Sequence, residues 1–129
     1  MENEKTAFLL TRFGLAASMF THGLVRLPKL ETFSNWMVGN FEKSLLPKIL
    51  VLPFSYVLPV LEFAVGLFLI FGLLTKQTLI AGAAIMIVLI FGSGMIEEWN
   101  SIPSQLIHLG FFVVLLLFLK YNSFCLDKN

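Results

Sequence analysis

The sequence predicts an all-α integral membrane protein, a four-helix bundle with an amphipathic interfacial helix between the first and second spans. Of its 129 residues, 57% are hydrophobic and 13% are charged, whereas soluble domains are about half apolar and a quarter charged. Four apolar segments each approach the ~20 residues that a helix needs to cross a ~30 Å hydrocarbon core. The length suits one domain, which we expect to cover 1–129.

The four spans follow from the apolar segments taken in order. The first is 6–27, which follows acidic residues rather than the basic start of a signal peptide, so we expect it to be retained. The second is 50–74, and the turn after it is so short that the third, 79–96, must return alongside it. The fourth is 102–121, where Ser101 suits an N-cap and Pro103 suits a first helical turn.

The segment 28–48, between the first two spans, has a mixed composition. Phe33, Trp36, Met37 and Phe41 recur at helical spacing, with polar residues between them. A helix with one apolar face and a Trp is typical of the membrane–water boundary. We therefore expect this helix to lie on the membrane surface.

Ionisable residues inside the spans are the candidates for function. Glu62 falls near the middle of the second span, where a charge costs roughly 2.5–3.5 kcal/mol. At a rise of 1.5 Å per residue, His22 and His108 lie roughly 8–9 Å below the face opposite the termini, within reach of Glu62 after a modest tilt. Glu62 could equally pair with Arg12 of the first span, and a purely structural Glu62–Arg12 pair that fixes helix packing is an alternative.

These residues define a predicted pocket that opens toward the face opposite the termini. The histidines could instead be interhelical hydrogen-bond partners, and Trp99 could be an interface anchor. Two histidines and one glutamate do not form a recognised metal-ligand spacing, so we predict no metal. The candidate catalytic residues are Glu62, His22 and His108, and the candidate substrate-binding residues are Arg12, Arg26, Gln105 and Trp99.

Three segments, in this order and spacing, resemble the DoxX family. Arg12-x-Gly14 followed by Phe20-Thr-His-Gly-Leu-Val-Arg-Leu27 is similar to the family's first helix, although the Arg26 position usually holds Lys. The stretch 61–75 is similar to its E-x-x-x-G-x-x-L-x-x-G-x-x-T element, and 121–127 to its closing G-x-x-S-L-D. The resemblance implies a small four-helix membrane bundle of prokaryotic type, some of whose relatives are subunits of thiosulfate:quinone oxidoreductase.

The first functional hypothesis is a quinone-interacting redox subunit or accessory protein. No covalently bound cofactor is expected, and a quinone would be a diffusible substrate. His22 and His108 would hydrogen-bond its head group, Glu62 would carry a proton, and Arg12 would tune the charge of Glu62. Electrons would come from a partner redox subunit, and whether the chain is itself an enzyme is left open.

Two further hypotheses come from other functional classes. The chain could be a non-catalytic membrane scaffold for a redox or stress-response partner, using the amphipathic helix. It could also be a small proton-coupled carrier, in which case four helices would require a homo-oligomer.

Charge and cysteine content limit the partners and the location. The net charge is +1 with no basic run, so the expected partner is the lipid bilayer and not a nucleic acid. The lone Cys125 cannot form an internal disulfide. Apart from Arg12, Lys and Arg divide evenly between the two faces, and Arg12 lies nearer the termini. We therefore expect a multi-pass protein of the prokaryotic cytoplasmic membrane with cytoplasmic termini.

Overall fold

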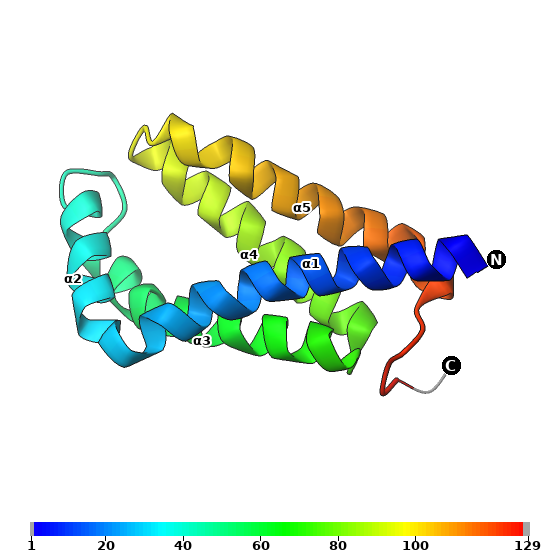
Figure 1. Ribbon diagram of the computed structural model, residues 1–129. Helices are drawn as coiled ribbons and strands as arrows, with labels where there is room; N and C mark the ends of the chain where they lie inside the picture. The colour runs from blue at the N-terminus through cyan, green and yellow to red at the C-terminus, as the bar shows by residue number, and fades with distance from the viewer. Residues whose placement is uncertain (1, 128–129) are drawn as a thin grey trace.

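The computed structural model describes residues 2–127; residues 1, 128 and 129, which the predicted domain includes, lie outside that range. The chain is built from helices (Figure 1). The α-helices are α1 (Glu2–Arg26), α2 (Leu30–Phe41), α3 (Lys48–Phe71), α4 (Thr75–Met95) and α5 (Ile102–Leu117). Short 3₁₀ turns occupy Leu27–Lys29, Trp99–Ser101 and Leu119–Tyr121.

Four helical stretches are long and apolar enough to cross a membrane. They are α1 continued through α2, then α3, then α4, and then α5 with the turn before it. The prediction of an all-α chain with four helices able to span a membrane is therefore confirmed. The fourth helix ends at Leu117 rather than at 121, and the 3₁₀ turn Leu119–Tyr121 takes up the remaining residues.

The helices pack as two pairs, α1 along α3 and α4 along α5. Figure 1 shows the pairs close together near the chain termini and spread apart toward α2. The turn between α3 and α4 uses Gly72 at φ 63° and Leu74 at φ 48°, both in the left-handed region. Gly72 is the usual residue type for such a helix end, because it has no Cβ to clash.

Two glycines bring α1 and α3 into backbone contact. A Cβ on Gly66 would overlap the backbone of Phe20, and a Cβ on Gly23 would lie 2.6 Å from the carbonyl oxygen of Pro59. Small residues at a helix crossing allow this approach inside a membrane, where packing rather than hydrophobicity holds helices together. By contrast, a Cβ on Gly14 would meet nothing within 4 Å.

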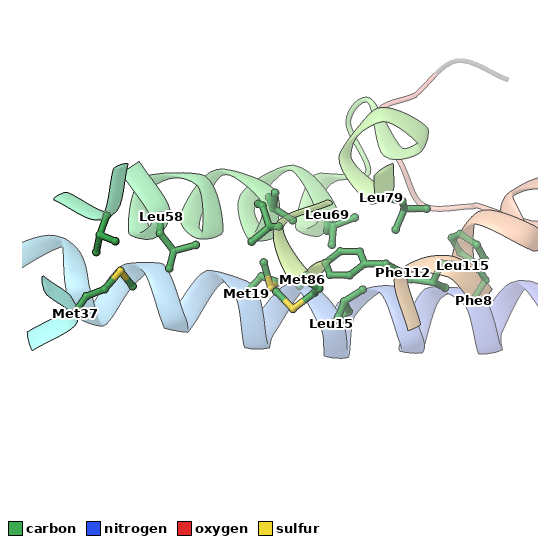
Figure 2. Close-up of a cluster of buried hydrophobic side chains, with 14 residues drawn as sticks. Phe8, Leu15, Met19, Met37, Leu58, Leu69, Leu79, Met86, Phe112 and Leu115 are labelled. Atoms are coloured by element: carbon green, nitrogen blue, oxygen red, sulfur yellow. The ribbon is translucent and has the colours of Figure 1, made fainter. Parts of the chain in front are cut away.

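The apolar core runs along the bundle from Phe8 and Leu115 near the termini to Leu58 and Met37 near α2 (Figure 2). Leu15, Leu69 and Phe112 meet there from α1, α3 and α5, and the ring of Phe112 lies against Gly82 of α4. Met19 and Met86 lie side by side in the middle of this core. Toward α2 the core narrows, which leaves room for a cavity.

Helix α2 is shorter than the predicted amphipathic helix and packs one face on α3. Ser34 Oγ of α2 lies 2.6 Å from Ser55 Oγ of α3, and Met37 is buried beside them. Trp36 is 61% exposed, and its ring stacks on that of Phe33. The amphipathic character of this helix and its location at a membrane surface stay predictions.

The C-terminal segment folds back across the end of α3. The backbone N–H of Leu126 donates to Phe71 O at 2.9 Å, and that of Asp127 donates to Gly72 O at 3.0 Å. The Asp127 carboxylate accepts hydrogen bonds from the N–H groups of Leu74 and Thr75, at 2.5 and 2.8 Å. A carboxylate at this position satisfies free N–H groups of α4 and complements the positive end of its dipole.

Candidate functional site: a cavity at the α2 end

A cavity of about 620 Å³ lies at the α2 end of the bundle, and all five α-helices contribute to its lining. Met19 and Met86 of the core border it on the inner side. Aromatic rings from several helices give it largely apolar walls, among them those of Phe33, Phe54 and Phe91. Five of the predicted site residues line it, namely His22, Arg26, Glu62, Gln105 and His108. An apolar cavity with a few convergent polar groups is the usual form of a small-molecule site.

An ion pair between Arg26 and Glu62 joins α1 to α3 in this cavity. Arg26 Nη1 donates to Glu62 Oε1 at 3.0 Å. The Glu62 side chain is 4% exposed and that of Arg26 is 29% exposed. The guanidinium also lies over the ring of Phe33, 4.4 Å from its centroid. The stacking ring and the carboxylate together hold the guanidinium in one place.

His22 keeps one ring nitrogen available to a ligand. Its Nδ1 lies 2.7 Å from the carbonyl oxygen of Ser18. Because a carbonyl oxygen only accepts, Nδ1 carries the proton and Nε2 is the acceptor of the neutral ring. Within residues 2–127, Nε2 has no hydrogen-bond partner. It can accept a hydrogen bond when the ring is neutral and donate one when the ring is protonated.

His108 is occupied at both nitrogens. Its Nδ1 lies 2.8 Å from Ser104 O, and its Nε2 lies 2.7 Å from Ser18 Oγ. The ring of His22 meets that of His108 edge to face, with centroids 6.2 Å apart. His108 therefore ties α5 to α1, which is the interhelical role that the sequence left as an alternative.

Gln105 brings an unpaired acceptor to the cavity. Its Nε2 donates to Ser93 Oγ of α4 at 3.0 Å. Its Oε1 is buried and accepts no hydrogen bond from any part of the chain between residues 2 and 127. A buried carbonyl oxygen without a partner is costly, and a ligand O–H would satisfy it. Sequence reasoning missed Ser93 and Ser18, because an isolated serine in an apolar helix gives no signal of which partner it faces.

Two predicted site residues lie outside the cavity. Arg12 is fully buried at the other end of the bundle. It donates to Asn122 Oδ1 at 2.5 Å and to the carbonyl oxygens of Ser123 and Phe124 at 2.9 and 2.7 Å. The expectation that Arg12 reaches Glu62 is therefore wrong, because the C-terminal segment covers Arg12 while Arg26 takes the carboxylate.

Trp99 is also absent from the cavity lining. It begins the 3₁₀ turn before α5, is 61% exposed, and lies beside Gly94. This placement leaves Trp99 free for the interface-anchor role that the sequence kept as an alternative.

Comparison with known proteins returns one family. A family model described as DoxX matches residues 7–94. The matched range includes His22, Arg26 and Glu62, whereas Gln105 and His108 lie beyond it. No curated protein and no solved structure matches the chain.

Proposed function

The chain belongs to the DoxX family, and from that premise we propose that it is a quinone-interacting redox subunit or accessory protein whose cavity binds a quinone head group. The observation that carries this proposal is the Arg26–Glu62 pair, whose carboxylate is buried beside a largely apolar cavity. A membrane protein rarely keeps a carboxylate buried in a spanning helix without a use for it.

The shape and chemistry of the cavity suit a flat ring with two oxygens. Phe33 and Phe54 offer apolar faces for the ring. His22 Nε2 and Gln105 Oε1 are both unpaired acceptors on the cavity wall within the described residues. They can accept the two O–H groups of a quinol, and a protonated His22 can donate to a quinone carbonyl instead.

The same residues can handle the protons of the redox step. Reduction of a quinone takes up two electrons and two protons and forms two O–H bonds. The electrons come from a partner redox subunit. Protonated His22 supplies one proton to a carbonyl oxygen, and Glu62 relays the other. Arg26 pairs with Glu62 and tunes its charge, which is the role that the sequence analysis had given to Arg12.

The experiment is a binding titration with purified full-length protein in lipid nanodiscs. The probes are a benzoquinol and a naphthoquinol head group, each with a decyl tail. Removing one hydrogen-bond partner from a buried site should weaken binding about tenfold, so we expect this loss in His22→Ala and in Gln105→Leu. Glu62→Gln should slow quinone reduction when the electron donor is supplied, because one of the two protons loses its relay.

The matched control is Glu42→Gln, the same change at an exposed position at the α2 end that does not line the cavity. It should bind and turn over like the wild-type protein. If His22→Ala, Gln105→Leu and Glu62→Gln all match Glu42→Gln in affinity and rate, the quinone proposal is excluded.

We also propose that this multi-pass protein lies in the prokaryotic cytoplasmic membrane with both termini in the cytoplasm. The support is Arg12, which lies at the end that carries the termini. A C-terminal reporter that is active only in the periplasm should be silent when fused to this chain, and an active fusion would reverse the orientation.

A further inference from the structure

We propose that the cavity ligand carries a long hydrocarbon tail, which leaves the cavity past His108 and lies in a groove between α1 and α5. This inference rests on the proposed quinone site and adds a tail subsite to it. The groove encloses about 390 Å³. Its lining is Leu10, Thr11, Gly14 and Leu15 of α1 and Ile107, His108 and Phe111 of α5.

The groove has the chemistry of a hydrocarbon site. Apart from His108 it has one polar side chain, Thr11, whose hydroxyl donates to Ala7 O at 2.8 Å. Both ring nitrogens of His108 are also occupied. The groove therefore offers no free hydrogen-bonding side chain among the residues that line it. A polar head group would lose its hydrogen bonds there, whereas an alkyl or polyprenyl chain would lose nothing.

The groove and the cavity adjoin at His108, whose hydrogen bond to Ser18 lies between them. Among the described residues, His108 is the one that lines both spaces. The Ser18–His108 hydrogen bond crosses from α1 to α5 at this boundary. Gly14 is eight residues before His22 on α1, which is about 12 Å along a helix. A tail that starts at a head group beside His22 therefore reaches the groove by running along α1 toward the termini.

The groove stays open because Gly14 has no side chain. A Cβ at Gly14 would meet no atom within 4 Å. Elsewhere α1 uses glycine for close contact, since Gly23 lies against the backbone of α3. At Gly14 the missing side chain leaves space instead of contact. We infer that this space accepts the tail of the cavity ligand rather than a neighbouring helix.

The test compares two probes with one head group, a dimethoxy-methyl-benzoquinone without a tail and the same quinone with a decyl tail. Full-length protein in nanodiscs is titrated with both. Gly14→Leu should fill the groove and weaken binding of the tailed probe about tenfold, while the tail-less probe binds as it does to the wild-type protein. Gly110→Leu is the matched control, because Gly110 also faces open space but does not line the groove. It should change neither affinity.

A second variant protects the test against misfolding. If Gly14→Leu does not give a folded protein, Ile107→Trp fills the groove from α5, where Ile107 is 59% exposed, and the same selective loss is expected. A decyl probe with a photoreactive group at the tail end should label α1 between residues 10 and 15. Unlabelled tailed quinone should block this labelling, and phospholipid should not.

The outcomes separate this inference from the proposed function. If the tail-less probe binds and depends on His22, but neither groove variant affects the tailed probe, the quinone site stands and the tail subsite is overturned. Competition by phospholipid in the labelling experiment would assign the groove to bilayer lipid and overturn it as well. If neither probe binds the wild-type protein, both proposals fail.

Discussion

The charge partner of Glu62 is Arg26, the last residue of α1, and both residues line the cavity at the α2 end of the bundle. Arg26 donates to Glu62 from the last residue of the helix, where a positive charge also complements the helix dipole. Arg12, fourteen residues earlier, binds the C-terminal segment instead. The two arginines of α1 therefore serve opposite ends of the protein.

The pair predicts an asymmetric response to charge removal. Arg26→Gln leaves a carboxylate that is 4% exposed without its partner and should destabilise the protein by about 3–5 kcal/mol. Glu62→Gln should cost less, because the longer Arg26 side chain, already 29% exposed, can extend toward water. The double variant should recover stability relative to Arg26→Gln. Denaturation by sodium dodecyl sulfate measures all three, and equal losses in the two single variants would contradict the role of burial.

The residue types of the site were predictable from the sequence, but their pairing was not. His22, Glu62, Gln105 and His108 were identified because polar groups in apolar spans are rare, and helical rise placed them near one level. Helical rise gives depth and not rotation about the helix axis. The choice between Arg12 and Arg26 depended on rotation and on the path of the C-terminal segment, which no local pattern encodes.

At the scale of elements, the spans were predictable and their crossings were not. Length and hydropathy predicted the four spans to within a few residues at most ends, because the bilayer core dictates the length of a spanning helix. The sequence analysis also gave Pro103 a place in the first turn of the fourth helix, and α5 begins at Ile102. Which glycines make contact depends on the partner helix. Gly66 and Gly23 do, while Gly14 lines a groove.

The crossing of α1 and α3 predicts that one methyl group at Gly66 is harmful. Gly66→Ala places a Cβ on the backbone of Phe20, which forces the helices apart at an overpacking cost of about 1–3 kcal/mol. Gly110→Ala is the matched control, because its Cβ meets nothing within 4 Å. It should be neutral or stabilise α5 by up to about 1 kcal/mol through helix propensity. Thermal unfolding in detergent compares the two variants. Similar unfolding temperatures would contradict the prediction, because they would show that α1 and α3 can move apart at no cost in stability.

Across the whole molecule, the two ends of the bundle have different structures. The termini end is packed and closed by the C-terminal segment, where Arg12, Asn122 and Thr75 form a buried chain of hydrogen bonds. The α2 end spreads apart around a cavity. Because the contacts at the termini end hold the two helix pairs together, the pairs can spread apart at the α2 end and still form one bundle.

That closure should depend on pH through Asp127. Partial burial raises the pKa of Asp127. Hydrogen bonds from the side chain and backbone of Thr75 and from the backbone of Leu74, together with the charge of Arg12, lower it by more. The net pKa of Asp127 is therefore below its ordinary value. The folded state therefore favours the ionised form. Its contribution to stability is fully present above the unfolded pKa of about 4 and is lost as the pH falls through the folded-state pKa.

The variant Asp127→Asn isolates this charge, since Asp127 is the chain's one aspartate and the amide keeps the size of the side chain. Because the ionised carboxylate accepts the Leu74 and Thr75 N–H groups more strongly than an amide oxygen does, the wild-type protein should unfold at a higher temperature at neutral pH. The difference should shrink as the pH falls below about 4. Glu42→Gln, exposed at the opposite end, should follow the wild-type curve throughout. A difference between wild type and Asp127→Asn that stays constant through the acid range would show that Asp127 acts through its shape rather than its charge.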